Sequence, residues 1–560
     1  MKIQKIRIGG KSIWPFTNGS GILTTDAYCA ANLMSRCEHY GMWTSKATSL
    51  REVVMPTREL MRSNPLGLEF GCRETILVQE SDGTFLNAVK LINEGAEKTR
   101  VKIQGANIPR DRVICIQVFG NSIPEFAEAT EALEDLCDII QLNGSCPHAE
   151  KTGMVFGQDP KIVYDLVKKV REVTKKDIDF KLTPNTPNIE EIARAAVEGG
   201  ATWLSGINTT GPFESPYLYN GRGGRSGRAI KEIGLQKVRE IRQAVGNHIR
   251  ITGMGGIETA RDVEEYFSAG ADVVGFGSVF AGMSDDDVVN FLPAIAYDLE
   301  NGTDSASSYR RKVNMSYKRV RIEKILNSCC DFKVFRTNVS IDAKPGQFVY
   351  AFLLGDMMLN GKPGEKPFSV MDNDPLTLGV LERGYFTERF NLLREGESFL
   401  YRGPYGQGVD VPNGSNVVLA AGGCGIAGLF LLAKKLSSRA KLSSLFGAKD
   451  KEHLPYLGEF RRYGDVKIAT EDGSLGKRGL VVDLFNESFV REFSRGAYFF
   501  NCGPRKMVEA VLPLELEVTG PERIYSSVDY MTRCGVGICG SCVDSKGRRT
   551  CVEGPFMRIE

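Results

Sequence analysis

Short apolar runs followed by amphipathic helical patterns alternate through residues 1–300, and this alternation restricts the fold more than any other feature. A strand-then-helix unit that repeats every ~25–35 residues predicts a parallel sheet, and a segment of this length suits an eight-fold barrel. We therefore predict an α/β fold class with a TIM (β/α)8 barrel over residues 1–300. The candidate strands are RVICIQVFG (112–120), CDIIQLNG (137–144), DIDFKLTPN (177–185), ATWLSGINT (201–209), HIRITGMGG (248–256) and ADVVGFGS (271–278).

The carboxyl ends of these runs carry polar residues and glycine in each case. One or two such ends are explained as turns, but six in series predict a site at the rim where parallel barrels build their sites. The ends are FGN (119–121), NGSC (143–146), KLTPN (181–185), INTTG (207–211), GMGG (253–256) and GFGS (275–278).

The rest of the chain changes character three times. Residues 301–315 are small and polar, which predicts a linker. Strand-like alternation over 316–412 predicts a small antiparallel β-barrel. An apolar strand, a Gly-rich turn and a helix open 413–518, which predicts an α/β nucleotide domain, and a cysteine-rich segment forms the small final domain, 519–560.

Bulk composition excludes several classes of protein. A net charge of +2 gives no reason to expect nucleic acid or an anionic membrane as partner. No apolar run reaches the ~18 residues of a membrane span, and the N-terminal residues lack the apolar core of a secretory signal. Most of the 14 cysteines are scattered through apolar segments, which is typical of free thiols in a reducing cytoplasm. Because the chain has only four histidines, we do not expect metal chemistry that depends on imidazole ligands.

Four cysteines near the C-terminus follow the spacing C-x4-C-x2-C-x8-C: Cys534, Cys539, Cys542 and Cys551. The pattern C-x4-C-x2-C with a fourth cysteine further on is that of plant-type [2Fe–2S] ligation, whereas zinc ribbons pair two separated knuckles. Glycines 535, 537 and 540 allow a tight loop whose N–H groups point at sulfur. We predict a [2Fe–2S] cluster, with structural zinc and free thiols as the alternatives.

An ordered set of motifs in the second half resembles the ferredoxin–NADP-reductase superfamily, a flavin barrel followed by a nicotinamide domain. The motifs are KPFSV (366–370), GYFT (384–387), RGPYG (402–406), AAGGCGIAG (420–428), EDGS (471–474) and NCGP (501–504). Lys366 stands where that family usually has arginine, so it keeps the charge and loses the planar fork. The resemblance implies FAD at Lys366, Pro367, Phe368, Ser369, Gly384 and Thr387, and a nicotinamide dinucleotide (NAD) at Gly422, Gly423, Gly425, Cys502, Gly503 and Pro504.

With the cysteine segment added, residues 316–560 resemble the electron-transfer subunit of the NAD-linked, two-subunit dihydroorotate dehydrogenases. The barrel half resembles the flavin-dependent dihydroorotate and dihydropyrimidine dehydrogenases, with NGSCPH (143–148) as its sharpest motif. Matching pieces around it are SKATSL (45–50), FLNAVKL (85–91), VFGNS (118–122), FKLTPN (180–185), GGRSGRAI (223–230) and GMGGI (253–257). A cysteine in this position has the structural alternative of a small buried apolar residue.

The resemblance implies FMN in the barrel, a small pyrimidine as substrate, and Cys146 as the base, with Ser145 and Lys46 as further catalytic residues. Asn87, Asn143, Asn208, Thr209 and His148 are implied to bind the pyrimidine. The implied FMN residues are Ser20, Lys46, Lys181, Gly227, Gly255, Gly256, Gly277 and Ser278. The family also implies a homodimer.

Two functions compete at this point. The first is oxidation of dihydroorotate with electrons passing through the cluster and FAD to NAD+, and the second is reduction of uracil or thymine by NAD(P)H. The fused electron-transfer module favours the first, and His148, where dihydroorotate enzymes usually have Asn, favours the second. A tRNA-dihydrouridine synthase and a non-catalytic redox scaffold are weaker alternatives. Lys90 has two interpretations, contact with a substrate carboxylate or exposure to solvent, and the direction of the reaction and the choice of NAD or NADP stay open.

Overall fold

The computed structural model describes residues 2–23, 26–53, 73–89, 91–144, 156–329, 331–354, 364–486, 489, 493, 496–527 and 532–559. Lys90, Ser145, Cys146 and His148 lie outside the described residues. The chain divides into two compact units. The first contains the N-terminal residues, Thr75–Val313 and Val536–Arg549, and the second contains residues 73–74, Asn314–Gly535 and Thr550–Glu560.

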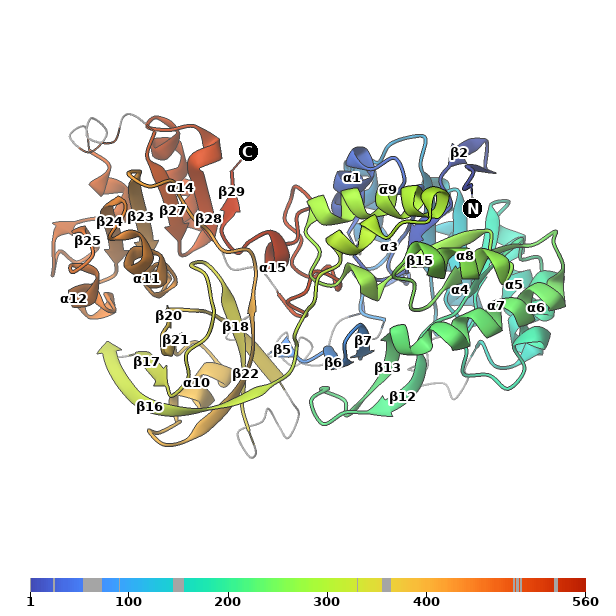
Figure 1. The fold of residues 1–560 in the computed structure, drawn as a ribbon, viewed down its shortest axis with the longest axis horizontal. Coiled ribbons are helices and arrows are strands. Elements are labelled where there is room, and N and C mark those ends of the chain that lie inside the picture. The colour runs from blue at the N-terminus through green and yellow to red at the C-terminus, as the bar shows by residue number, and fades with distance from the viewer. Residues whose placement is uncertain are drawn as a thin grey trace. The chain divides into compact units, whose positions relative to one another are not determined.

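Eight parallel strands close into a barrel in the first unit, which confirms the predicted TIM barrel (Figure 1). All six candidate strands form, and two strands of three residues each complete the closure. In chain order the strands are β3 (Phe16–Asn18), β4 (Met42–Thr44), β8 (Val113–Val118), β9 (Ile139–Leu142), β10 (Asp177–Lys181), β11 (Trp203–Gly206), β14 (Arg250–Met254) and β15 (Val273–Phe276).

The helices between these strands begin and end at recognisable residues. In α5, Asp159 caps the first turn by accepting from the N–H groups of Lys161 and Ile162, and Val163, Leu166, Val167 and Val170 bury one face at helical spacing. A capping box of Ser284 and Asp287 begins α9, and Gly302 ends it with φ 67°. The helices are α1 (Ala27–Arg36), α3 (Ala96–Gly105), α4 (Ile123–Glu131), α5 (Pro160–Val173), α6 (Ile189–Glu198), α7 (Lys231–Val245), α8 (Ala260–Ser268) and α9 (Asp285–Asn301).

Two small antiparallel sheets accompany the barrel. The first is the pair β1 (Ile6–Ile8) and β2 (Lys11–Ile13). The second has the order β12-β13-β7-β6 and consists of β12 (Thr210–Glu214), β13 (Arg222–Gly227), β7 (Thr84–Asn87) and β6 (Leu77–Ser81). Its register sets Asn87 opposite Gly224, which brings residues far apart in sequence together.

The second unit begins with an eight-stranded sheet in which every pairing is antiparallel. Its order is β20-β21-β17-β16-β22-β18-β19-β5. The strands are β5 (Arg73–Glu74), β16 (Lys318–Cys329), β17 (Phe332–Thr337), β18 (Phe348–Phe352), β19 (Gly364–Ser369), β20 (Asp372–Asn373), β21 (Leu376–Leu381) and β22 (Ser398–Tyr405), with helix α10 (Tyr385–Asn391) after β21.

A mostly parallel sheet of order β26-β25-β24-β23-β27-β28-β29 completes the second unit. The strands are β23 (Asn416–Gly422), β24 (Lys441–Ala448), β25 (Asp465–Thr470), β26 (Lys477–Arg478), β27 (Tyr498–Cys502), β28 (Ile524–Ser527) and β29 (Met557–Arg558), and the helices are α11 (Gly425–Leu436), α12 (Leu457–Phe460), α14 (Arg505–Leu516) and α15 (Thr550–Glu553). Among the described residues, no helix is long and apolar enough to cross a bilayer.

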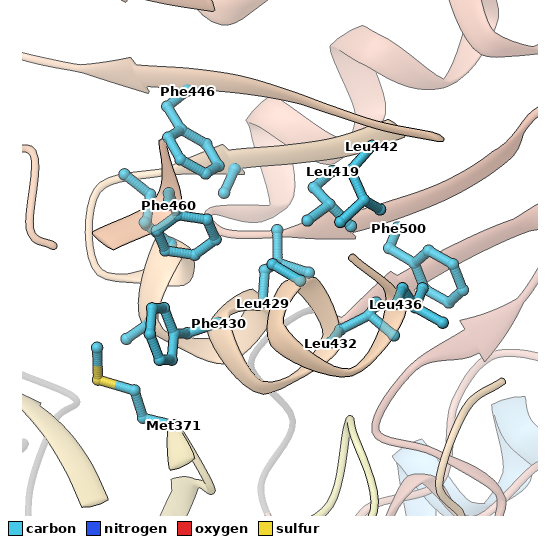
Figure 2. Packing of buried hydrophobic residues seen from close by; sticks show 14 of the residues in the cluster. Met371, Leu419, Leu429, Phe430, Leu432, Leu436, Leu442, Phe446, Phe460 and Phe500 are labelled. Carbon is cyan, nitrogen blue, oxygen red and sulfur yellow. The ribbon is translucent and has the colours of Figure 1, made fainter. Parts of the chain in front are cut away.

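Helix α11 is buried against this sheet by a cluster of aliphatic and aromatic side chains (Figure 2). Leu429 of the helix is fully buried, and Leu419 of β23, Phe446 of β24 and Phe500 of β27 belong to the same cluster. The helix follows directly on the Gly-rich turn, so this packing fixes where that turn lies.

We expect Leu429→Ala to lower the free energy of unfolding by about 2–5 kcal/mol, because it removes a buried side chain and leaves a cavity. Urea denaturation measures the change. Leu392→Ala is the matched control, since Leu392 is 64% exposed and its loss should change the unfolding energy by less than about 0.5 kcal/mol. Equal effects of the two substitutions would contradict the packing described.

Candidate active site

A cavity of about 1340 Å³, including its opening to solvent, lies in the first unit. Parallel barrels bring the carboxyl ends of their strands to one rim, and residues from those ends line this cavity. All twelve predicted barrel-site residues that the structure describes are among its lining: Ser20, Lys46, Asn87, Asn143, Lys181, Asn208, Thr209, Gly227, Gly255, Gly256, Gly277 and Ser278. The roles assigned to them stay predictions.

Glycines form one part of the wall, and no side chain fits at two of them. At Gly227, φ is 92° and a Cβ would lie 1.9 Å from the carbonyl oxygen of Gly83. At Gly256, φ is 69° and a Cβ would lie 2.8 Å from the carbonyl oxygen of Gly227. A Cβ at Gly277 would meet no atom within 4 Å, so the backbone there borders open space. Exposed backbone of this kind suits a phosphate group, which N–H groups bind without side chains.

Amide side chains form the polar part of the wall. Asn87 Nδ2 donates to the carbonyl of Gly224 at 3.1 Å, and Asn208 Oδ1 accepts from the N–H of Thr209 at 2.8 Å. Asn143 Nδ2 donates to Gln117 Oε1 at 3.2 Å. These bonds hold the amides in fixed orientations. Each amide offers both a donor and an acceptor, which is the combination that a cyclic imide requires.

Sequence reasoning missed part of the lining. Gln117 is a buried polar residue within the apolar strand β8 and lines the cavity. A single polar residue in an otherwise apolar strand is the sequence pattern that could have predicted its place in the lining. The apolar lining residues Ile22, Ala47, Leu77 and Met254 carry no comparable signal. Apolar walls with a few placed polar groups are typical of sites for flat cofactors and small ligands.

The cysteine segment contributes directly to the same cavity. Ile538 and Cys539 line it, although more than 230 residues separate them from the end of the last barrel helix, Asn301. Two backbone hydrogen bonds anchor the segment to the barrel unit: Leu23 N–H donates to Ile538 O at 3.0 Å, and Gly282 N–H donates to Val536 O at 2.9 Å. The spacing predicted Cys539 as a cluster ligand but gave no sign that it borders the barrel cavity.

A buried ion pair reinforces this anchoring. The fully buried guanidinium of Arg549 donates to Asp285 Oδ1 at 2.7 Å and 3.1 Å. It also donates to the carbonyl oxygens of Met283, at 2.9 Å, and Gly537, at 3.2 Å. Asp285 accepts in turn from Asn32 Nδ2 at 2.8 Å, so the pair is well hydrogen-bonded, as a buried pair must be.

All four predicted cluster ligands are buried, with exposed fractions between 1% and 6%. Cys539 and Cys542 belong to the first unit, and Cys534 and Cys551 belong to the second. Within the described ranges no group of three or more His, Cys, Asp or Glu side chains is arranged to hold a metal ion. Gly535, Gly537 and Gly540 have φ of 80°, 77° and 66°, which gives the tight loop that the spacing predicted. Thiols are the donor type that an iron–sulfur cluster takes, and ligation by these four cysteines stays a prediction.

In the second unit, the predicted FAD residues come from two adjoining elements. Lys366, Pro367, Phe368 and Ser369 lie on β19, and Gly384 precedes α10 with φ 147°. Thr387 is buried on the first turn of α10, where its hydroxyl donates to Gly384 O at 3.0 Å and accepts from Arg383 N–H at 2.9 Å. Phe368 packs near Phe390 of the same helix, with ring centroids 5.7 Å apart.

The predicted nicotinamide residues meet at one edge of the parallel sheet. Strand β23 has β24 on one side and β27 on the other, so the strand order reverses there, and open α/β sheets bind nucleotides at such a point. The Gly-rich turn 422–425 follows β23, and 502–504 ends β27. They approach so closely that a Cβ on Gly425 would lie 2.1 Å from Cys502 O. Burial raises the pKa of the Cys502 thiol to about 12, so this thiol is not a nucleophile near neutral pH.

A second buried arginine holds the other end of the cysteine loop. Arg402 and Glu365 are each 1% exposed and form a two-bonded pair, Nε to Oε2 at 2.7 Å and Nη2 to Oε1 at 2.6 Å. Arg402 Nη1 donates to the carbonyl oxygen of Cys534 at 2.9 Å. The guanidinium also lies 4.0 Å from the ring centroid of Tyr350. The backbone at the first predicted ligand is therefore held by a rigid, fully paired cation.

Comparison with known proteins matches both halves of the chain. The family profile described as dihydroorotate dehydrogenase matches residues 69–291. The "Dihydroorotate dehydrogenase B (NAD(+)), catalytic subunit" of Bacillus mycoides is 39% identical over 213 residues, which covers 36% of this chain and 67% of the relative. The catalytic subunit of Methanocaldococcus jannaschii is 38% identical over 210 residues, 36% of this chain and 68% of the relative.

The second half matches a different polypeptide. The "Probable dihydroorotate dehydrogenase B (NAD(+)), electron transfer subunit" of Thermococcus kodakarensis is 35% identical over 245 residues, which covers 44% of this chain and 97% of the relative. The chain belongs to the dihydroorotate dehydrogenase B family. This family is one of oxidoreductases, and this chain joins sequences similar to its catalytic and its electron transfer subunits in one polypeptide.

We expect Gly227→Ala to abolish or strongly weaken binding of the FMN predicted from the sequence, because its Cβ would collide with Gly83 O and distort the wall. FMN retained after gel filtration measures the loss. Gly221→Ala is the matched control, since Gly221 also has a positive φ, 75°, but a Cβ there would meet nothing within 4 Å. The control should cost about 1–2 kcal/mol of stability and keep FMN. Full FMN retention by the Gly227 variant would contradict the assignment of this wall.

Proposed function

We propose that this chain oxidises dihydroorotate to orotate and delivers the two electrons to NAD+. Bound in the barrel, FMN would supply the hydride acceptor, and a [2Fe–2S] cluster and FAD held by the second half of the chain would supply one-electron transfer toward the nicotinamide. The observation that supports this most strongly is the single cavity lined by the predicted flavin and pyrimidine residues together with Cys539. The match of separate catalytic and electron transfer subunits to the two halves of the chain supports it further.

The protein's own groups have distinct tasks in this reaction. Dihydroorotate loses a proton from one ring carbon and a hydride from its neighbour. Cys146, with Ser145 beside it, receives the proton, and a thiolate at a strand end can act as such a base. Lys46 and Lys181 supply positive charge to the cavity wall, which stabilises negative charge that develops there during hydride transfer.

Substrate binding is assigned to the amides of the wall. Asn87, Asn143 and Asn208 with Thr209 hydrogen-bond the ring, and His148 completes the set. Ser20, Gly227, Gly255, Gly256, Gly277 and Ser278 hold the FMN, with the glycine backbone at its phosphate. The hydrogen bonds that fix Asn87 and Asn143 support these roles, because a pre-oriented amide loses little entropy when it binds.

The remaining cofactors follow the chain order that the sequence predicted. We assign FMN to residues 1–300, FAD to 316–412, NAD to 413–518 and the cluster to 519–560, after a linker at 301–315. Cys534, Cys539, Cys542 and Cys551 hold the cluster. The position of Cys539 in the lining of the barrel cavity supports transfer of electrons out of that cavity. A homodimer through the barrel completes the proposal.

We expect Cys146→Ala to keep FMN while the rate of flavin bleaching by dihydroorotate falls by roughly 10²–10⁴-fold, since the proton acceptor is gone. Anaerobic stopped-flow absorbance measures the rate. Cys137→Ala is the control, because Cys137 is a buried thiol outside the cavity lining. Bleaching at the wild-type rate would remove Cys146 from the mechanism. Bleaching of the wild-type flavin by dihydrouracil and not by dihydroorotate would favour a pyrimidine reductase instead.

We expect Cys539→Ser to remove the cluster's visible absorption and to uncouple NAD+ reduction from dihydroorotate oxidation, while dihydroorotate still bleaches FMN. Cys37→Ser, at a buried cysteine outside the predicted ligand set, should leave both signals intact. Coupled turnover in the Cys539 variant would show that electrons reach NAD+ by another path.

A further inference from the structure

Three polar side chains stand inside the barrel on neighbouring strands. Gln117 of β8, Gln141 of β9 and Asp179 of β10 are 1%, 2% and 1% exposed. Each occurs among apolar residues of its strand, where burial of a polar group costs free energy unless it is hydrogen-bonded. Nothing in the reaction proposed above uses Gln141 or Asp179.

These side chains form one continuous chain of hydrogen bonds. Gln141 Nε2 donates to Asp179 Oδ2 at 2.6 Å, and Ser205 Oγ donates to the same oxygen at 2.6 Å. Gln117 Nε2 donates to Gln141 Oε1. Asp179 Oδ1 is buried and has no hydrogen-bond partner among the described residues.

The other end of the chain reaches the cavity. Gln117 Oε1 accepts from Ser20 Oγ at 2.7 Å and from Asn143 Nδ2 at 3.2 Å. Gln117, Ser20 and Asn143 all line the cavity. Asn143 is also one of the residues assigned to the pyrimidine ring.

The carboxylate at the inner end fixes the direction of every bond. An ionised carboxylate only accepts, so Gln141 must turn its NH2 toward Asp179 and its oxygen toward Gln117. Gln117 must then turn its NH2 toward Gln141 and its oxygen toward Asn143, and Asn143 must turn its NH2 toward Gln117. If the inner group could donate, all three amides could rotate and the sequence of donors and acceptors would reverse.

We propose that Asp179 is a positioning residue for the substrate: through Gln141 and Gln117, its carboxylate sets which end of the Asn143 amide faces the pyrimidine. This inference rests on the proposed function, because it takes Asn143 as a pyrimidine ligand. Asp179 does not touch the cavity and acts only through the two glutamines.

This series of hydrogen bonds is sensitive to pH in a range in which binding can be measured. Burial raises the pKa of the Asp179 carboxyl to about 6, although the hydrogen bonds from Gln141 and Ser205 and the charge of Lys181 lower it. Among the described residues, the buried Cys115 thiol of β8 also interacts with it, and burial raises the pKa of that thiol well above its usual value. Below about pH 6, Asp179 therefore gains an O–H donor, and the direction of the chain is no longer fixed.

The test measures the dissociation constant of orotate from the FMN-loaded protein between pH 5 and 8, using the perturbation of flavin absorbance. For the wild-type protein, we expect affinity to fall roughly tenfold as the pH drops through about 6, the size expected when one buried hydrogen bond is mismatched. Asp179→Asn should bind roughly tenfold more weakly at pH 7.5 and show no step with pH. Gln141→Met interrupts the series of hydrogen bonds but retains the Asp179 carboxylate. Its orotate affinity should also show no step with pH. The test therefore does not depend on the folding of a single variant.

Asp177→Asn is the matched control, because Asp177 lies on the same strand and accepts from Thr202 Oγ1 at 2.8 Å, away from the chain. It should retain both the affinity and the step. A wild-type affinity that is flat with pH would overturn the inference. So would a step that survives in Asp179→Asn or Gln141→Met, since it would then belong to another group such as His148. Failure of the wild-type protein to bind orotate at any pH would instead overturn the proposed function, and the inference with it.

Discussion

The buried guanidinium of Arg549 is the interaction on which the proposed coupling depends. It joins Asp285, at the start of α9, to the backbone of a segment that lies more than 250 positions later in the sequence. A buried ion pair adds little net stability compared with a well-packed apolar pair, but removal of one partner leaves an uncompensated charge and costs about 3–5 kcal/mol. Such a pair therefore selects one position for the segment. That position brings Cys539 to the wall of the cavity that is assigned to FMN and the pyrimidine.

A second buried arginine–carboxylate pair of this kind occurs in the second unit. Arg402 is paired with Glu365 and donates to the carbonyl oxygen of Cys534, the first predicted ligand. In both cases a fixed fork of donors satisfies a carboxylate and a backbone carbonyl together, which the single ammonium of lysine does not do. The two buried arginines hold the loop by the carbonyl oxygens of Cys534 and Gly537.

Much of the fold could be predicted from sequence, and the exceptions have physical reasons. Six barrel strands are apolar runs with glycine or polar ends and were predicted, whereas Phe16–Asn18 and Met42–Thr44 are too short to show a period. The polar and glycine residues that were predicted for the cavity could be found because each lies in a motif at the end of one strand, and each motif can be recognised by itself. The contribution of Ile538 and Cys539 could not be predicted, because it depends on contacts between distant segments. Gln117, Gln141 and Asp179 were visible as single polar residues in apolar strands, but only the structure shows that they form one chain. The loop with Cys146 lies outside the described residues, so its place rests on the motif alone.

The central claim is that one polypeptide couples oxidation of a dihydropyrimidine to reduction of a nicotinamide. Anaerobic absorbance of the purified wild-type protein tests this most directly. Dihydroorotate should bleach the flavin absorption, and subsequent addition of NAD+ should restore it with formation of one NADH for each orotate. If only NADH bleaches the flavins, and uracil or thymine but not orotate restores the colour, the account of the substrate and of the direction of electron flow is wrong.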